Sequence, residues 1–131
     1  MIDRYTYPEM GRIWTDENEF QTMLDIEICA CEIMAELGEI PAEAVPVIKA
    51  KAKFTVPRIR EIEKETRHDI LAFLTAVAEN VGDESKYIHL GLTSSDVKDT
   101  ALGVMMKQAA GILLDDLEKV HAVLKRRAAE Q

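Results

Sequence analysis

The chain has 131 residues, a formal net charge of −8 and 47% hydrophobic residues. This length suits one domain, or one domain and part of the next, and the hydrophobic content is sufficient for a folded core. The acidic balance argues against non-specific binding to nucleic acid or to an anionic membrane. No apolar run approaches the roughly 20 residues of a membrane span, and the first residues do not form a signal peptide.

The sequence predicts an all-α fold, because no apolar pattern of period two persists. Residues 1–14 are expected to be irregular and to pack on the body, holding Arg4 and Tyr5 at a pocket; the alternative is a simple hydrophobic latch. Cys29 and Cys31 lie two apart on a predicted helix and point in different directions. We expect both to be reduced packing residues of a cytoplasmic protein.

The first long helix is predicted over residues 16–37, with Thr15 as its N-cap and Gly38 at its end. Glu27 falls within the apolar arc of this helix. An unpaired buried carboxylate is costly, so we expect Glu27 to form a structural ion pair with an arginine from elsewhere. A catalytic role for Glu27 is the less favoured alternative.

Three shorter helices are expected next. The first covers residues 41–51, and the second covers 56–66 behind the N-cap Thr55. The third is apolar and begins after Asp69, a natural N-cap. Residues 82–94 then form the only long loop in the prediction, and a loop of this size in a helical domain is more often functional than idle.

Two helix starts are candidate anion sites. Arg67, His68 and Asp69 meet at the first of them, where a cation and an imidazole beside free N–H groups would hold a phosphate or a carboxylate. Thr93 and Ser94 precede the longest helical pattern, where hydroxyls surround unpaired N–H groups. The alternative at both places is ordinary helix capping.

The longest helix is predicted over residues 95–131, with apolar residues at steps of three and four and candidate kinks at Gly103 and Gly111. No glycine or proline terminates it, which indicates a fragment of a longer polypeptide or a helix that needs a partner. We therefore expect a helical domain over 1–94 and the start of a long-helix bundle over 95–131.

Three stretches, taken together, resemble the adenylosuccinate lyase family, within the fumarase/aspartase superfamily. They are Arg4-Tyr5-x-x-Pro8-Glu9-Met10 with Ile13-Trp14, then Thr66-Arg67-His68-Asp69-Ile70-x-Ala72-Phe73, then His89-x-Gly91-Leu92-Thr93-Ser94-x-Asp96 with Asp99-Thr100-Ala101.

The resemblance implies a homotetramer that eliminates fumarate from two succinylamino nucleotides of purine biosynthesis, adenylosuccinate and the succinylaminoimidazole carboxamide ribotide. It implies no metal and no organic cofactor, and adenylosuccinate, AMP and fumarate as small-molecule partners. The residues that match substrate contacts are Arg4 and Tyr5 near the phosphate, Arg67, His68 and Asp69 in a second segment, Thr93 and Ser94 at anionic groups, and the nearby His89.

The same resemblance places the main catalytic groups outside these residues. Elimination needs a base for a carbon-bound proton and an acid for the leaving nitrogen. In the family the base is a serine in a flexible loop and the main acid is a histidine, both beyond the matched region. We therefore expect part of each site here and no main catalytic residue. The alternatives are a helical interaction module and another superfamily lyase, acting on argininosuccinate or a dicarboxylate; Arg4-Tyr5 and residues 66–69 favour the nucleotide enzyme.

Overall fold

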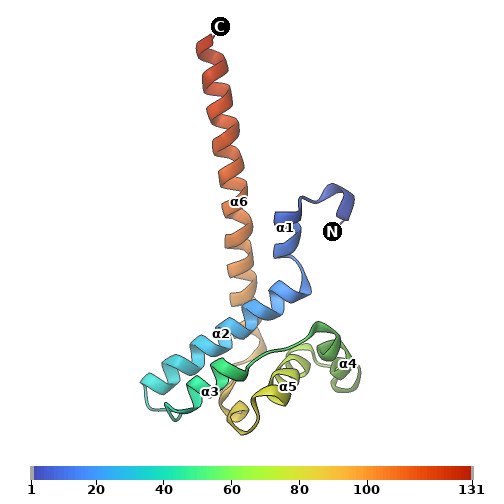
Figure 1. Ribbon diagram of the computed structural model, residues 1–131, viewed down its shortest axis with the longest axis vertical. Coiled ribbons are helices and arrows are strands. Elements are labelled where there is room, and N and C mark those ends of the chain that lie inside the picture. Colours follow the sequence, from blue (N-terminus) through green and yellow to red (C-terminus); the bar gives the residue numbers. More distant parts are fainter. Residues whose placement is uncertain (1, 131) are drawn as a thin grey trace.

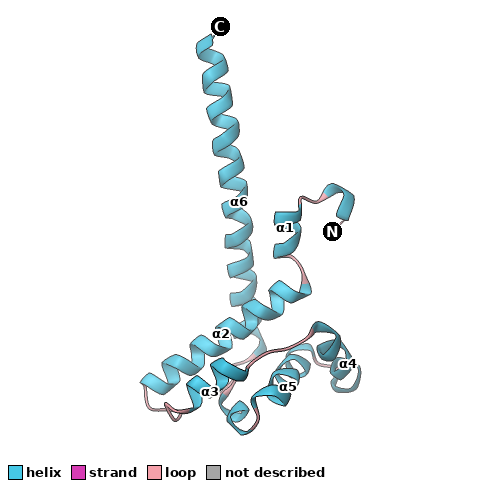
Figure 2. Cartoon of the chain, viewed as in Figure 1, coloured by secondary structure: helices cyan, strands magenta, loops and turns pink. Residues whose placement is uncertain are grey.

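The computed structural model describes residues 2–130, and every regular element in that range is helical (Figure 2). The all-α prediction is therefore confirmed. No helix in the described part of the chain is long and apolar enough to cross a membrane. In chain order the elements are η1 Asp3–Tyr5, α1 Pro8–Ile13, α2 Asp16–Glu36, α3 Ala44–Lys51, α4 Val56–Thr66, α5 Asp69–Val81, η2 Asp83–Tyr87 and α6 Ser94–Glu130.

Helix α6 is one straight helix, and α2 crosses it near its N-terminal end, called its foot below. The C-terminal half of α6 does not pack on the other long helices (Figure 1). Val97, Ala101, Met105 and Ala109 are buried, one on each successive turn of the first half. All residues from 113 to 130 are exposed. The helix runs without a break through both glycines that were candidate kinks.

The core lies where α2, α4 and α5 meet below the foot of α6 (Figure 1). Phe20 of α2 stacks on Phe73 of α5 with ring centroids 5.6 Å apart. Phe54 meets both rings edge-on. Such aromatic contacts add to the burial of three large apolar side chains, so this cluster fixes α2 and α5 against each other.

Both predicted ends of α2 are confirmed. The Thr15 hydroxyl accepts from the N–H of Asn18 at 3.2 Å, which satisfies one free donor of the first turn. At the other end Gly38 has φ +76°, and the N–H of Glu39 donates to the carbonyl of Met34 at 2.9 Å. This backbone pattern is a Schellman turn, which needs a left-handed residue and so favours glycine.

Three expected segments differ from the structure. Residues 1–14 are not irregular where described: they form η1 and α1, because Pro8 suits the first turn of a helix. Helix α3 begins at Ala44, three residues later than expected, since only a single turn bond joins the N–H of Ala44 to the carbonyl of Pro41. The segment 82–94 is not a plain loop, because η2 occupies its first half.

The two cysteines lie in different environments. Cys29 is exposed on the polar side of α2, so its prediction as a packing residue is wrong, whereas Cys31 is buried in the core. Burial raises the pKa of the Cys31 thiol to about 11, and the nearby carboxylates Glu27 and Glu32 add to the effect. The buried thiol is therefore a small apolar packing group rather than a nucleophile.

Candidate functional site

The backbone is strained at two predicted ligand-binding residues. Arg67 has φ +50° and His89 has φ +64°, and they are the only non-glycine residues with positive φ in the described range. Left-handed backbone is unfavourable for residues with a Cβ and tends to persist at functional sites. Arg67 closes α4, where its N–H donates to the carbonyl of Glu63 at 2.8 Å, and its side chain is exposed.

His68, rather than Asp69, is the N-cap of α5. Its ring Nδ1 accepts from the N–H of Leu71 at 3.2 Å, the third N–H of the helix. This is the position that a capping side chain normally reaches, and the imidazole nitrogen takes the place of a hydroxyl or carboxylate oxygen. The expected role of Asp69 as N-cap is therefore wrong. Because Nδ1 accepts here, the neutral ring carries its proton on Nε2.

The Asp69 carboxylate instead joins two helix starts. Asp69 forms an ion pair with Lys98 of α6, and its Oδ1 accepts from the N–H of Ile70 at 2.8 Å. The hydrogen bond from the Lys98 ammonium is the main reason that the pKa of Asp69 is lowered. Lys98 lies four residues after Ser94 and so shares its face of α6. The ion pair thus brings the start of α5 within about one turn of the start of α6.

The hydroxyls at the start of α6 are not used for capping. The carboxylate of Asp96, the third residue of the helix, accepts from the N–H of Thr93, the residue just before the helix, at 2.8 Å. This bond is the return half of a capping box. Among the described residues none forms a hydrogen bond with the hydroxyl of Thr93 or of Ser94, and Thr93 is exposed. These hydroxyls and the first N–H groups of α6 remain available to an anion.

His89 is fixed by the buried carboxylate of Glu27. Oε2 of Glu27 accepts from the backbone N–H of His89 at 2.9 Å, and Oε1 lies 2.6 Å from the ring Nδ1. Glu27 is 1% exposed. The expected ion pair with an arginine is therefore wrong: the partner is a histidine 62 positions away, and two bonds offset the cost of burying the carboxylate.

Arg4 and Tyr5 lie apart from the other predicted site residues. Tyr5 and residues 6–10 form one wall of a groove of about 850 Å³, and residues 112–120 of α6 form the other. At 1.5 Å per residue this part of α6 starts about 27 Å along the helix from Ser94. Within one chain the structure does not unite Arg4 and Tyr5 with the starts of α5 and α6. Tyr5 lines this groove, and Arg4 lines a separate concavity with Tyr5, Thr6 and Tyr7, which agrees with the expectation that the two residues lie at a pocket.

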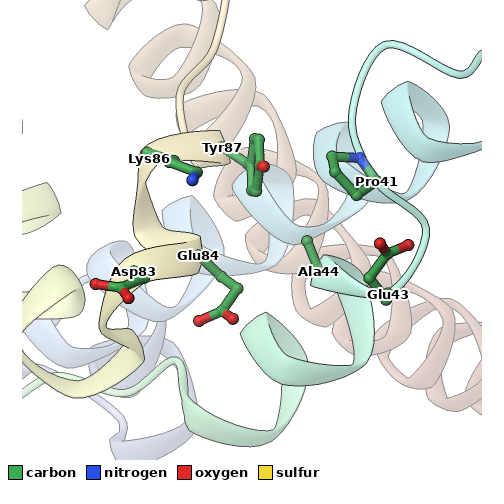
Figure 3. A pocket seen from close by; sticks show the side chains of 7 residues that line it. All are labelled: Pro41, Glu43, Ala44, Asp83, Glu84, Lys86 and Tyr87. Carbon is green, nitrogen blue, oxygen red and sulfur yellow. The ribbon is translucent and has the colours of Figure 1, made fainter.

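A second hollow, of about 140 Å³, lies between the start of α3 and η2 (Figure 3). Glu43, Asp83 and Glu84 bring three carboxylates to it, and its one cation, Lys86, lies against the ring of Tyr87 at 5.1 Å from the ring centroid. Such surroundings disfavour an anionic ligand. None of the predicted site residues lines this hollow, so we do not assign it to the candidate site.

Sequence reasoning missed Lys98 and the partner of Glu27. The signal for Lys98 was available, because a lysine four residues after Ser94 must share its helix face. The pairing of Glu27 with His89 had no local signal. It depends on how residues 82–94 fold across α2, and the spacing of apolar residues along the sequence does not predict that path.

Comparison with known proteins identifies the family of this chain. The family model described as "Lyase" matches residues 3–131. The chain therefore belongs to this lyase family.

The relatives reported below are all adenylosuccinate lyases. The chain is 56% identical over 130 residues to adenylosuccinate lyase of Bacillus subtilis and 56% identical to that of Synechocystis, covering 99% of this chain in both cases. It is 48% identical to adenylosuccinate lyase of Aquifex aeolicus. The chain spans 30% of the length of each of these relatives.

Solved structures share the fold. The 3-carboxy-cis,cis-muconate lactonizing enzyme of Pseudomonas putida superimposes with a TM-score of 0.87 at 28% identity, covering 98% of this chain and 31% of that enzyme. A fumarate lyase of Mesorhizobium superimposes with a TM-score of 0.81 at 23% identity, covering 88% of this chain and 28% of the other. The second likeness concerns the fold alone.

Proposed function

We propose that this chain supplies the first part of an adenylosuccinate lyase. The whole enzyme would eliminate fumarate from adenylosuccinate and from the succinylaminoimidazole carboxamide ribotide, as a cytoplasmic homotetramer that uses no cofactor. The observation that carries the proposal is the identity of 56% to an adenylosuccinate lyase over 99% of the chain. The donors at the starts of α5 and α6 are consistent with it, because the substrate carries a phosphate and two carboxylates.

The proposed roles follow the chemistry of each group. Thr93, Ser94 and the N–H groups of α6 bind an anionic group of the substrate, and Arg67 contributes a cation from the neighbouring helix end. His68 presents the Nε2–H of its neutral ring to the substrate, and His89 presents its Nε2. In this proposal Asp69 positions the second segment through its ion pair with Lys98.

Arg4 and Tyr5 enter the proposal through the oligomer. The groove that Tyr5 lines starts about 27 Å along α6 from the hydroxyls, so in one chain this end of the molecule cannot reach the same small ligand. We propose that each complete site takes its phosphate-binding residues from one copy and its α5 and α6 starts from another. The interaction-module alternative has one observation in its favour, the exposed apolar residues on the far half of α6.

The experiment is a titration of the 15N-labelled 131-residue chain with adenylosuccinate. The proposal predicts changes at His68, His89 and Ser94. Ser94→Ala should weaken binding about tenfold, since it removes a hydrogen bond to a charged group. Ser95→Ala is the matched control, because Ser95 is the adjacent exposed hydroxyl and lies on another face. No change at the three residues, or equal losses in the two variants, would contradict the proposal.

We also expect the 131-residue chain to have no measurable lyase activity by itself. The family resemblance assigns the base and the main acid to positions beyond the matched region, and elimination without both is slow. A spectrophotometric assay of fumarate release from adenylosuccinate would test this. Turnover by the purified chain would show that its own residues suffice.

A further inference from the structure

Glu27 is an acidic side chain buried at a place where the proposed chemistry does not use it. It is 1% exposed, and both of its oxygens are engaged by a single residue, His89. No buried side-chain oxygen or nitrogen lacks a hydrogen-bond partner in the described part of the chain. When Glu27 is ionised its carboxylate has no proton to donate, so each group facing it must be a donor.

This requirement determines the state of the His89 ring. Nδ1 lies 2.6 Å from the carboxylate and must carry a proton. In the neutral ring Nε2 therefore has the lone pair. No described residue bonds Nε2, and the His89 side chain is 19% exposed, so this nitrogen is open to a ligand.

The same carboxylate also stabilises the strained backbone. The φ of +64° at His89 would normally favour glycine, and the bond from the backbone N–H to Oε2 of Glu27 offsets part of that cost. One side chain of α2 thus fixes both the backbone and the ring of a residue in the loop before α6. A general packing residue would not be expected to do both.

We propose that Glu27 is a positioning residue: it holds His89 as the Nδ1–H tautomer and so makes Nε2 the atom that meets the ligand. The identity of that ligand, a succinylamino nucleotide, depends on the proposed function; the tautomer does not. His68 provides a contrast, because its Nδ1 accepts from the N–H of Leu71 and its neutral ring must carry the proton on Nε2.

The first test is the ring-nitrogen NMR spectrum of the unliganded 131-residue chain, at a pH where the rings are neutral. The proposal predicts that Nδ1 of His89 is protonated and Nε2 is not, and that His68 shows the opposite pattern. An Nε2–H tautomer at His89 would overturn the proposal. This arm needs no variant, so its result does not depend on whether a substitution folds.

The second test is Glu27→Gln, which keeps the shape of the side chain. An amide has one acceptor and one donor end, and only one orientation avoids placing two donors face to face. Its oxygen must accept from the backbone N–H of His89, and its NH₂ must donate to Nδ1. The variant should therefore move the ring proton of His89 to Nε2, a change that loss of packing alone would not produce.

Glu32→Gln is the matched control, because Glu32 is a carboxylate of the same helix that pairs with Lys49 at the surface. It should leave the His89 pattern unchanged. A Glu27→Gln chain that is folded by circular dichroism but retains the Nδ1–H tautomer would overturn the proposal.

Addition of adenylosuccinate separates the inference from the proposed function. A shift of Nε2 of His89 on binding supports both. The predicted tautomer without any response to adenylosuccinate supports the positioning role and contradicts the proposed substrate. A response of His89 in the wrong tautomer supports the substrate and overturns the positioning role.

Discussion

At the scale of single residues, Arg67 is the clearest place where stability and ligand binding should oppose each other. Its φ of +50° is unfavourable for a residue with a Cβ, and its side chain makes no hydrogen bond to another described residue. The strained backbone of Arg67 thus lowers the stability of the fold, and the proposed explanation for it is ligand binding rather than packing.

Arg67→Gly should therefore stabilise the chain by about 1 kcal/mol while weakening adenylosuccinate binding. Urea unfolding and the NMR titration measure the two effects. Lys64→Gly, within the last turns of α4, is the control and should destabilise by about 1 kcal/mol without changing binding. A destabilised Arg67→Gly chain would contradict the strain argument.

The sequence was informative about individual residues in proportion to how local their partners are. The Thr15 cap and the Gly38 turn depend on bonds within a few positions, and both predictions are confirmed. The expected cap at Asp69 was wrong because a lysine 29 positions away competes for that carboxylate. Periodicity placed Glu27 inside the core, but only the folded chain shows its donor.

At the scale of elements, the contact between α5 and α6 made by Asp69 and Lys98, here called the joint, gives the candidate site its geometry. The Asp69–Lys98 ion pair lowers the pKa of Asp69 and raises that of Lys98. A carboxylate whose pKa is lower in the folded state stabilises the fold above its unfolded pKa. That contribution disappears as the pH falls through the folded pKa.

Asp69→Asn should consequently destabilise the chain by less than about 1 kcal/mol at neutral pH, since both partners are about two-fifths exposed. The difference from the parent chain should shrink as the pH drops below the ordinary Asp pKa of 3.8. Urea unfolding across this range measures it. Asp83→Asn, at an exposed carboxylate far from the joint, is the control. A difference that does not depend on pH would show that the ion pair has no part in it.

At the scale of the whole molecule, the far half of α6 carries a row of exposed apolar side chains. Leu113, Leu117, Val120 and Leu124 are each more than half exposed and follow one another at steps of four, three and four. This spacing forms a stripe along one side of the helix, and such stripes mark association surfaces. We propose that residues 95–131 begin a helical bundle completed by further helices, and that residues 1–94 form the first domain.

The 131-residue chain should therefore self-associate at high concentration, above its monomer mass of 14.7 kDa. Leu117→Lys together with Leu124→Lys should return it towards monomer, because charge in the stripe prevents burial. Glu118→Lys alters charge beside the stripe and is the control. Light scattering with size-exclusion chromatography measures all three, and a monomeric parent chain would contradict the prediction.

The fold class could be predicted at this scale because helical periodicity extends over most of the chain. The arrangement of the site could not. Nothing in the spacing of residues placed Tyr5 and residues 6–10 beside the middle of α6, since that depends on Ile13 packing with Met105 and Ala109. The two helix starts of the candidate site can be predicted from the sequence. The position of the third segment, which carries Arg4 and Tyr5, becomes apparent only in the folded chain.

The central claim is that the starts of α5 and α6 bind one succinylamino nucleotide together. Intermolecular NOEs between adenylosuccinate and the labelled chain test it most directly. The account predicts that the same bound molecule shows contacts to the ring of His68 and to the methyl group of Thr93. Contacts to only one of these residues, or to neither, in a saturated complex would contradict it.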